Sequence, residues 1–212
     1  VTDTNQVTTI KSLEAVNAET VNVTFTGAAT FDDELVIDAN DSGVKGSVVV
    51  NVTAAATFTG GVDMGGGTDA GDGTTTLKII GTNAQIITGA IDSLASANQG
   101  ILEVTNTAGL VTFATAIGAG NEIKSITIGG AAFDSDVKFA AATSAIAINV
   151  LGGDASDGTE DSTVNFVAAT AGAMVLTSGS VATNIAKVSF TATAATTAFT
   201  GAITAARTTG TG

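Results

Sequence analysis

The chain has 212 residues, 44% of them hydrophobic, and it contains no Cys, His, Pro, Trp or Tyr. Its 20 acidic and 7 basic residues give a formal net charge of −13, which opposes nucleic-acid binding because phosphates are met by Lys and Arg. Without His and Cys the commonest general bases and thiol nucleophiles are missing, so we expect a protein that is not an enzyme.

Short segments rich in β-branched residues, bounded by Gly, Asn, Asp or Ser, recur along the whole chain and predict an all-β protein. In chain order the predicted strands are 21–25, 35–37, 48–52, 77–80, 101–104, 123–128, 146–151, 164–167 and 187–191. Helical signals are weak and limited to residues 10–18, which could equally be an extended lead-in, and residues 90–97. No run of 18 or more apolar residues is present, so we expect no membrane span.

A degraded repeat runs through these strands. The pattern VNVTFTGAATF at residues 21–31 recurs as VNVTAAATF at residues 50–58. Weaker versions of this pattern are present at residues 126–133 and 188–199. The predicted strands start roughly 17 to 29 residues apart, a spacing that overlaps that of stacked structural repeats.

Stacking such units joins their apolar edges into one continuous core, and small Ala, Thr and Val side chains let them pack closely. The repeat therefore predicts a parallel β-solenoid in which Phe of one coil stacks on Phe of the next. The alternative is one or two antiparallel β-sandwiches with chance similarity. We expect residues 1–212 to form a single repetitive β domain, with residues 1–20 as an N-terminal arm or cap. Because the chain starts at Val1, we expect a processed protein or a fragment of a larger surface protein.

Three acidic, glycine-containing loops are candidate calcium sites, because Ca²⁺ takes six to eight oxygen ligands on loops that glycine allows to curl. The loops read DANDSG, VDMGGGTDAGDG and GGDASDGTED. The alternative is a solvated turn, in which Asp, Asn and Gly are favoured for their backbone behaviour alone. The candidate ligands are Asp38, Asn40, Asp41, Asp63, Asp69, Asp72, Asp154, Asp157, Glu160 and Asp161.

The segment IKSLEAVNAETVNVTFTGAATF, followed by VVVNVTAAATFTGGVDMGGGTDAGDG, resembles the β-solenoid regions of bacterial S-layer proteins and RTX-type surface proteins. The general character of its sequence is also similar to that of autotransporter passengers such as the rickettsial outer-membrane B proteins. This resemblance implies extracellular display on a cell surface, self-assembly, and Ca²⁺ as the assembly ion. The chain departs from the family in lacking intact calcium nonapeptides. The matching residues are Ile10, Leu13, Glu14, Val16, Asn17, Val21, Asn22 and Val23.

The leading hypothesis is thus a structural extracellular protein that assembles with copies of itself into a surface layer or coat, with divalent cations bridging carboxylates. Cell-surface glycans are further candidate partners. One alternative is an adhesin or autotransporter passenger that acts as a binding module. Another is a filament subunit joined by β-strand addition, for which residues 1–9 and the Ala/Thr-rich C-terminal strand provide extended segments.

Overall fold

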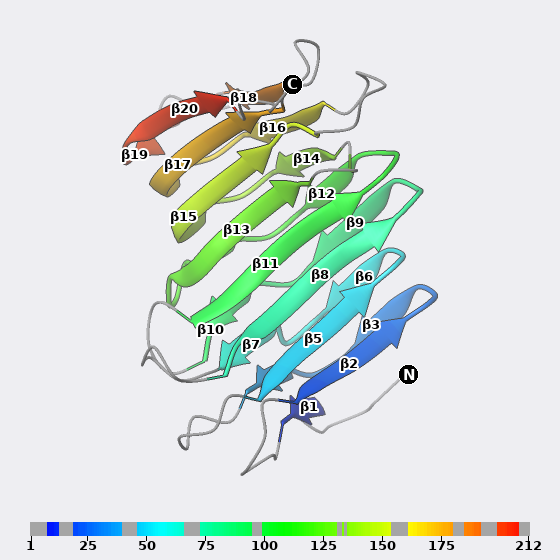
Figure 1. Cartoon of the computed structure of the whole chain (residues 1–212). Coiled ribbons are helices and arrows are strands. Elements are labelled where there is room, and N and C mark those ends of the chain that lie inside the picture. The colour runs from blue at the N-terminus through cyan, green and yellow to red at the C-terminus, as the bar shows by residue number, and fades with distance from the viewer. Residues whose placement is uncertain are drawn as a thin grey trace.

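The computed structural model shows an all-β protein whose strands wind into a parallel β-solenoid (Figure 1). It describes residues 8–12, 19–39, 46–65, 73–94, 99–130, 133, 135–153, 161–179, 185–191 and 199–207. Every pairing between its named strands is parallel, which confirms the predicted solenoid and makes the antiparallel sandwich wrong.

The largest sheet, here called the large sheet, has nine strands among the described residues and forms the face toward the viewer in Figure 1. Successive strands along it come from successive coils, so each coil contributes its own backbone to the same ladder. Its members are β2 (Thr20–Phe25), β5 (Ser47–Val52), β8 (Thr75–Gly81), β11 (Gln99–Asn106), β13 (Ile123–Gly129), β15 (Thr143–Leu151), β17 (Thr170–Ser178), β19 (Phe199–Thr200) and β20 (Ile203–Arg207).

Within the described ranges, a second sheet of seven short strands backs the large sheet, and a third sheet of four strands closes the first coils. The second sheet consists of β3 (Ala29–Phe31), β6 (Ala56–Phe58), β9 (Gln85–Thr88), β12 (Val111–Phe113), β14 (Asp136–Phe139), β16 (Ser162–Phe166) and β18 (Ala186–Phe190). The third sheet consists of β1 (Thr8–Lys11), β4 (Leu35–Asp38), β7 (Val62–Gly65) and β10 (Ile91–Ser93).

The side of the solenoid that the third sheet forms, here called the third side, becomes narrower after β10. In the part of the chain that the structure describes, it continues from there as isolated bridges from Ile91 to Ile117 and from Ile117 to Thr143. Thr143 is the first residue of β15 and pairs with Thr170, the first residue of β17. The cross-section therefore changes from three sheets at the N-terminal end to two sheets and a corner at the C-terminal end.

The core consists of inward side chains that stack in columns from coil to coil. One column of the large sheet contains a residue from every coil, from Val23 on β2 to Ile203 on β20. Its members are Val23, Val50, Leu77, Leu102, Ile126, Ile148, Met174 and Ile203. Between the two ends all of them are buried. A parallel column from Phe25 to Ala205 lies beside it.

Phenylalanine rings stack along the second sheet, as the repeat predicts. Phe31 stacks on Phe58 with ring centroids 5.2 Å apart, and Phe139 lies between Phe113 and Phe166 at 5.1 and 4.9 Å. The stack is interrupted at β9, where Ile87 pairs with Phe113. Gly89 follows with a φ of +118, a backbone conformation that residues with a side chain rarely adopt, and a Cβ there would lie 2.1 Å from the Phe58 carbonyl oxygen. A larger residue at this position cannot fit beneath Phe58.

The structural register differs from the repeat read off the sequence. ATF of β3 pairs with ATF of β6, so this half of the repeat is confirmed. The alignment of Val21 with Val50 is wrong, because Val21 pairs with Val48 and Val23 pairs with Val50. A shift of two residues leaves the same side chains facing inward, so alternation alone does not distinguish the two registers.

Two further sequence expectations change in the structure. Coils range from 22 residues, between Ile126 and Ile148, to 31 residues, between Ala56 and Ile87, so the longest exceeds the predicted spacing.

The weak helical signals are wrong where the structure describes them, because residues 8–11 and 91–93 are strands of the third sheet. β1 is the edge strand of that sheet, in the region expected to be an arm or cap. Residues 13–18 and 95–97 lie outside the described residues.

The stacked rings yield a stability prediction. Phe139→Ala removes a fully buried ring between two others, and we expect it to cost about 3–5 kcal/mol of unfolding free energy because the solenoid cannot close over the cavity. Ile86→Ala, at a side chain that is 59% exposed on β9, is the matched control and should change little. Urea unfolding followed by circular dichroism measures both, and equal costs for the two variants would contradict the stacked core.

Candidate functional site

The outer surface of the third sheet carries a row of carboxylates from three successive coils. Glu34 precedes β4, Asp63 lies on β7 and Asp92 lies on β10, where it pairs in register with Asp63. We call these three residues the acidic row. Asp63 and Asp92 occupy equivalent positions of consecutive coils, and Glu34 lies two residues before Val36, which is the β4 partner of Asp63.

The acidic row perturbs its central member. Burial, a side-chain hydrogen bond with Glu34, and the negative charges of Glu34 and Asp92 together raise the pKa of Asp63 from its usual 3.8 to about 6. All three causes disfavour the charged form, and a protonated Asp63 can donate a hydrogen bond to Glu34. Asp63 therefore titrates in the mildly acidic range.

Asp92 links its own coil to the next one. Its Oδ1 accepts hydrogen bonds from the backbone N–H of Gly120 at 2.9 Å and of Asn121 at 3.4 Å. The side-chain amide of Asn121 donates in turn to the carbonyl oxygen of Ser93 at 3.1 Å. These contacts hold the loop that follows Ile117 against β10, at the point where the third side narrows.

The structure separates the predicted calcium ligands that it describes. Asp38 forms an ion pair with Lys11, with Oδ2 2.7 Å from Nζ. Asp161 accepts a hydrogen bond from the backbone N–H of Ile185 at 2.8 Å, and Asp63 belongs to the acidic row. Within the described ranges, no group of three acidic residues is arranged to hold a metal ion. The other candidates lie outside the described residues: Asn40, Asp41, Asp69, Asp72, Asp154, Asp157 and Glu160.

Glu34 and Asp92 are the residues that sequence reasoning missed. Asp63 and Asp92 are 29 residues apart and pair in register, so a repeat spacing of this length could have indicated their proximity. Glu34 is not part of this spacing, because Asp63 pairs with Val36 on β4. Neither Glu34 nor Asp92 lies in one of the three Asp/Gly loops, which are the pattern that predicts calcium ligands.

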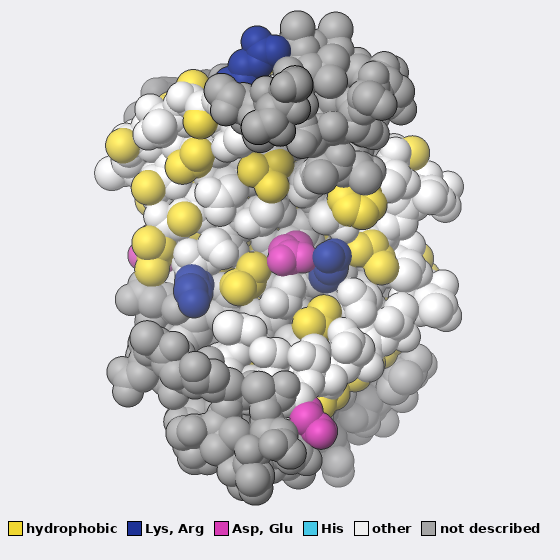
Figure 2. Space-filling view, in the orientation of Figure 1, with side chains coloured by type: hydrophobic (Ala, Val, Ile, Leu, Met, Phe, Trp, Pro, Cys, Tyr) yellow, Lys and Arg dark blue, Asp and Glu magenta, His cyan; other side chains and the backbone are white. Residues whose placement is uncertain are grey.

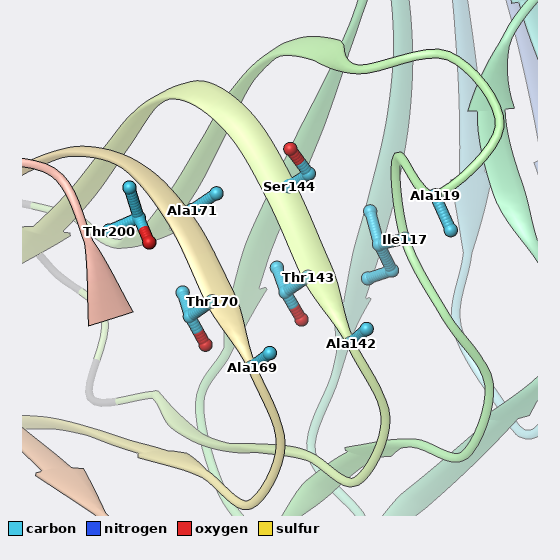
Figure 3. Close-up of a pocket in the computed structure, with 9 residues that line it drawn as sticks. All are labelled: Ile117, Ala119, Ala142, Thr143, Ser144, Ala169, Thr170, Ala171 and Thr200. Carbon is cyan, nitrogen blue, oxygen red and sulfur yellow. The ribbon is translucent and has the colours of Figure 1, made fainter. Parts of the chain in front are cut away.

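A shallow groove of about 190 Å³ lies where the third side has narrowed to a corner (Figure 3). Figure 3 shows Thr143 and Thr170 side by side on neighbouring coils, with their hydroxyl groups on the same side. Both hydroxyls already donate to carbonyl oxygens of their own coil, those of Ala141 and Ala168. The described residues that line the groove therefore present mainly methyl groups and no charged side chain. Its lining consists of Ile117, Ala119, Ala142, Thr143, Ser144, Ala169, Thr170, Ala171 and Thr200.

The large sheet offers a broad outer face with few charges. Figure 2 shows scattered hydrophobic side chains over it and an adjacent acidic and basic pair near its centre. On this sheet Lys78 Nζ lies 3.0 Å from Glu103 Oε2, and the two residues pair in register on β8 and β11. The acidic row and this face thus differ strongly in charge.

Comparisons with known proteins add no relative to these observations. No protein-family model, curated protein or solved structure matches the chain. The described part of the chain contains no helix that is long and apolar enough to cross a membrane.

The acidic row predicts that stability depends on pH. Because the pKa of Asp63 is higher in the folded protein than its usual 3.8, the folded state binds the proton more tightly. This contribution is complete below about pH 3.8 and is lost as the pH rises through about 6. Asp63→Asn keeps a neutral side chain, so we expect a gain at pH 7 of about 1 kcal/mol or less, since solvent screens a partly exposed group.

Urea unfolding of both proteins at pH 4 and pH 7 measures this effect. The gain should vanish at pH 4, where Asp63 of the unaltered protein is protonated. Asp136→Asn, at an exposed position on the second sheet, is the matched control outside the acidic row. A gain of equal size at pH 4 and pH 7 for Asp63→Asn would contradict the proposed role of the acidic row.

Proposed function

We propose that this chain is a structural protein of a bacterial cell surface, which assembles with copies of itself into a layer or coat. The observation that carries the proposal is the unbroken column from Val23 to Ile203. A core that passes from coil to coil through the whole described solenoid gives a rod with flat sides. Such a rod suits a structural protein, which acts through its shape.

Charge favours divalent cations as part of this assembly. The chain carries a net charge of −13, and the acidic row concentrates carboxylates on one side of the solenoid. Neighbouring copies repel each other unless the facing carboxylates are neutralised. Exposed ion pairs contribute only about 0–1 kcal/mol each, so a layer needs many contacts or bridging ions. Ca²⁺, with its preference for oxygen ligands, fits this role.

Export to the cell surface agrees with the composition. A chain with 20 acidic residues and few basic ones stays soluble at high ionic strength, where its charges are screened. The resemblance of residues 10–75 to surface-protein solenoids supports the same location. Glycans of the cell surface are the partner we propose for attachment.

Electron microscopy and sedimentation with and without Ca²⁺ test this function. We expect sheets or fibres with Ca²⁺, and their dispersal by a chelator, because the carboxylates of neighbouring copies then repel one another. A variant combining Glu34→Gln, Asp63→Asn and Asp92→Asn should need less Ca²⁺ to assemble, and Asp136→Asn is its control. If chelation changes neither assembly nor Tm, the role of calcium is wrong. A chain that stays monomeric under all these conditions would instead favour the binding module.

A further inference from the structure

The outer face of the large sheet carries almost none of the negative charge of the chain. The charged residues on the described strands of this sheet are Glu103, Lys78, Lys124 and Arg207. Two copies of a chain with a net charge of −13 repel each other, but a face with a single acidic residue adds little to that repulsion. This broad face is therefore a side on which two copies can approach each other closely.

Lys78 and Glu103 form the charged centre of this face. They pair in register on β8 and β11, with Nζ 3.0 Å from Oε2. Their side chains point outward and remain accessible, with relative exposures of 32% and 34%. Each charge therefore has one neighbour of opposite sign within the face and can meet a second one from above it.

The column that contains this pair is complementary to its own reverse. From β2 to β15 it consists of Thr24, Asn51, Lys78, Glu103, Thr127 and Asn149. None of these six residues is buried. When the column is laid against its own reverse, each hydroxyl faces an amide, each amide faces a hydroxyl, and Lys78 faces Glu103. A self-complementary surface of this kind is what a two-fold contact between identical subunits requires.

Charge selects one of the two possible two-fold axes in the plane of the face. An axis along the strands, between β8 and β11, reverses the order of the coils and keeps each position along the strand, so the column faces its own reverse. An axis along the solenoid that lays the column on itself keeps the order of the coils, and it sets Lys78 against Lys78 and Glu103 against Glu103. The first axis also keeps the strands of the two sheets aligned, as in β-sandwiches.

We propose that the outer face of the large sheet binds the same face of a second copy, about a two-fold axis that runs along the strands between β8 and β11. Lys78 of each copy then meets Glu103 of the other, and each of the four charges has two neighbours of opposite sign. The contact is closed after two copies, because each face is fully used. The protein is therefore a dimer without any metal ion.

The dimer also brings two acidic rows together, and this part of the inference rests on the proposed function. In the first four coils the strand of the third sheet precedes the strand of the large sheet, so the acidic row lies on the side where the large-sheet strands begin. An axis along the strands places this side of both copies at the same edge of the dimer. Carboxylates of both copies are then available to Ca²⁺ there, so the dimer is the unit that cations join into a layer.

Charge reversal tests the contact, measured by analytical ultracentrifugation in the presence of a chelator. Lys78→Glu places four acidic groups at the centre of the contact, and Glu103→Lys places four basic groups there. We expect the unaltered protein to sediment as a dimer and each variant to raise the Kd of the dimer at least about tenfold at low salt, because like charges then face each other. The difference should shrink at high salt.

Two rescue experiments exclude a general loss of structure. An equimolar mixture of the Lys78→Glu and Glu103→Lys variants should form a dimer with one copy of each, because an acidic centre then meets a basic one. The double variant Lys78→Glu, Glu103→Lys should dimerise as the unaltered protein does. Lys138→Glu, a charge reversal on the second sheet, is the matched control and should leave the Kd nearly unchanged.

The outcomes separate this inference from the proposed function. If the unaltered protein is a monomer with chelator but forms sheets with Ca²⁺, the dimer is wrong and the surface layer stands, with the face left to a partner such as a glycan. A dimer that both charge reversals leave intact, or a mixture that gives no rescue, also contradicts the contact. A dimer that is lost and rescued as described, but forms no sheets or fibres with Ca²⁺, supports the contact and overturns the surface layer.

Discussion

The parallel backbone ladder between coils is the constraint on which the rest of the structure depends. A coil has no partner within itself for its extended backbone, so it must place each strand beside the equivalent strand of the next coil. Once the ladder forms, side chains at matching positions stack, and small or β-branched residues fill the narrow space between the sheets. Leu77 and Leu102, or Phe139 and Phe166, meet because their backbones are paired.

The same ladder explains where glycine and small residues are required. At the corner beside the groove, Gly172 has a φ of +136, and a Cβ there would lie 2.0 Å from the Ala145 carbonyl oxygen. A side chain at this position would push two coils apart. The groove exists because the third side narrows after β10 and only small side chains, such as Ala142 and Ala169, line the remaining corner.

The stacking of coils also determines which charged side chains become neighbours on the surface. A ladder that brings like residues together stabilises an apolar column, but it places like charges side by side when the repeated residue is acidic. Asp63 and Asp92 are such a pair, and burial together with the neighbouring Glu34 and Asp92 raises the pKa of Asp63 to about 6. On the large sheet the neighbours Lys78 and Glu103 have opposite charges, so the same geometry yields an ion pair. The ladder thus decides both what holds the coils together and which surfaces need counterions.

The sequence by itself determined the all-β class, the stacking of coils and the Phe stack, because β-branched alternation and the recurring ATF are local patterns. Most of the candidate site was not foreseen: of the predicted ligands, only Asp63 belongs to the acidic row, and Glu34 and Asp92 lie outside the Asp/Gly loops. The tertiary structure alone decided the pairing of Val23 with Val50 and the narrowing of the third side. The physical reason is that strand alternation has a period of two, so it fixes which side chains face inward but leaves the register to the closure of each coil.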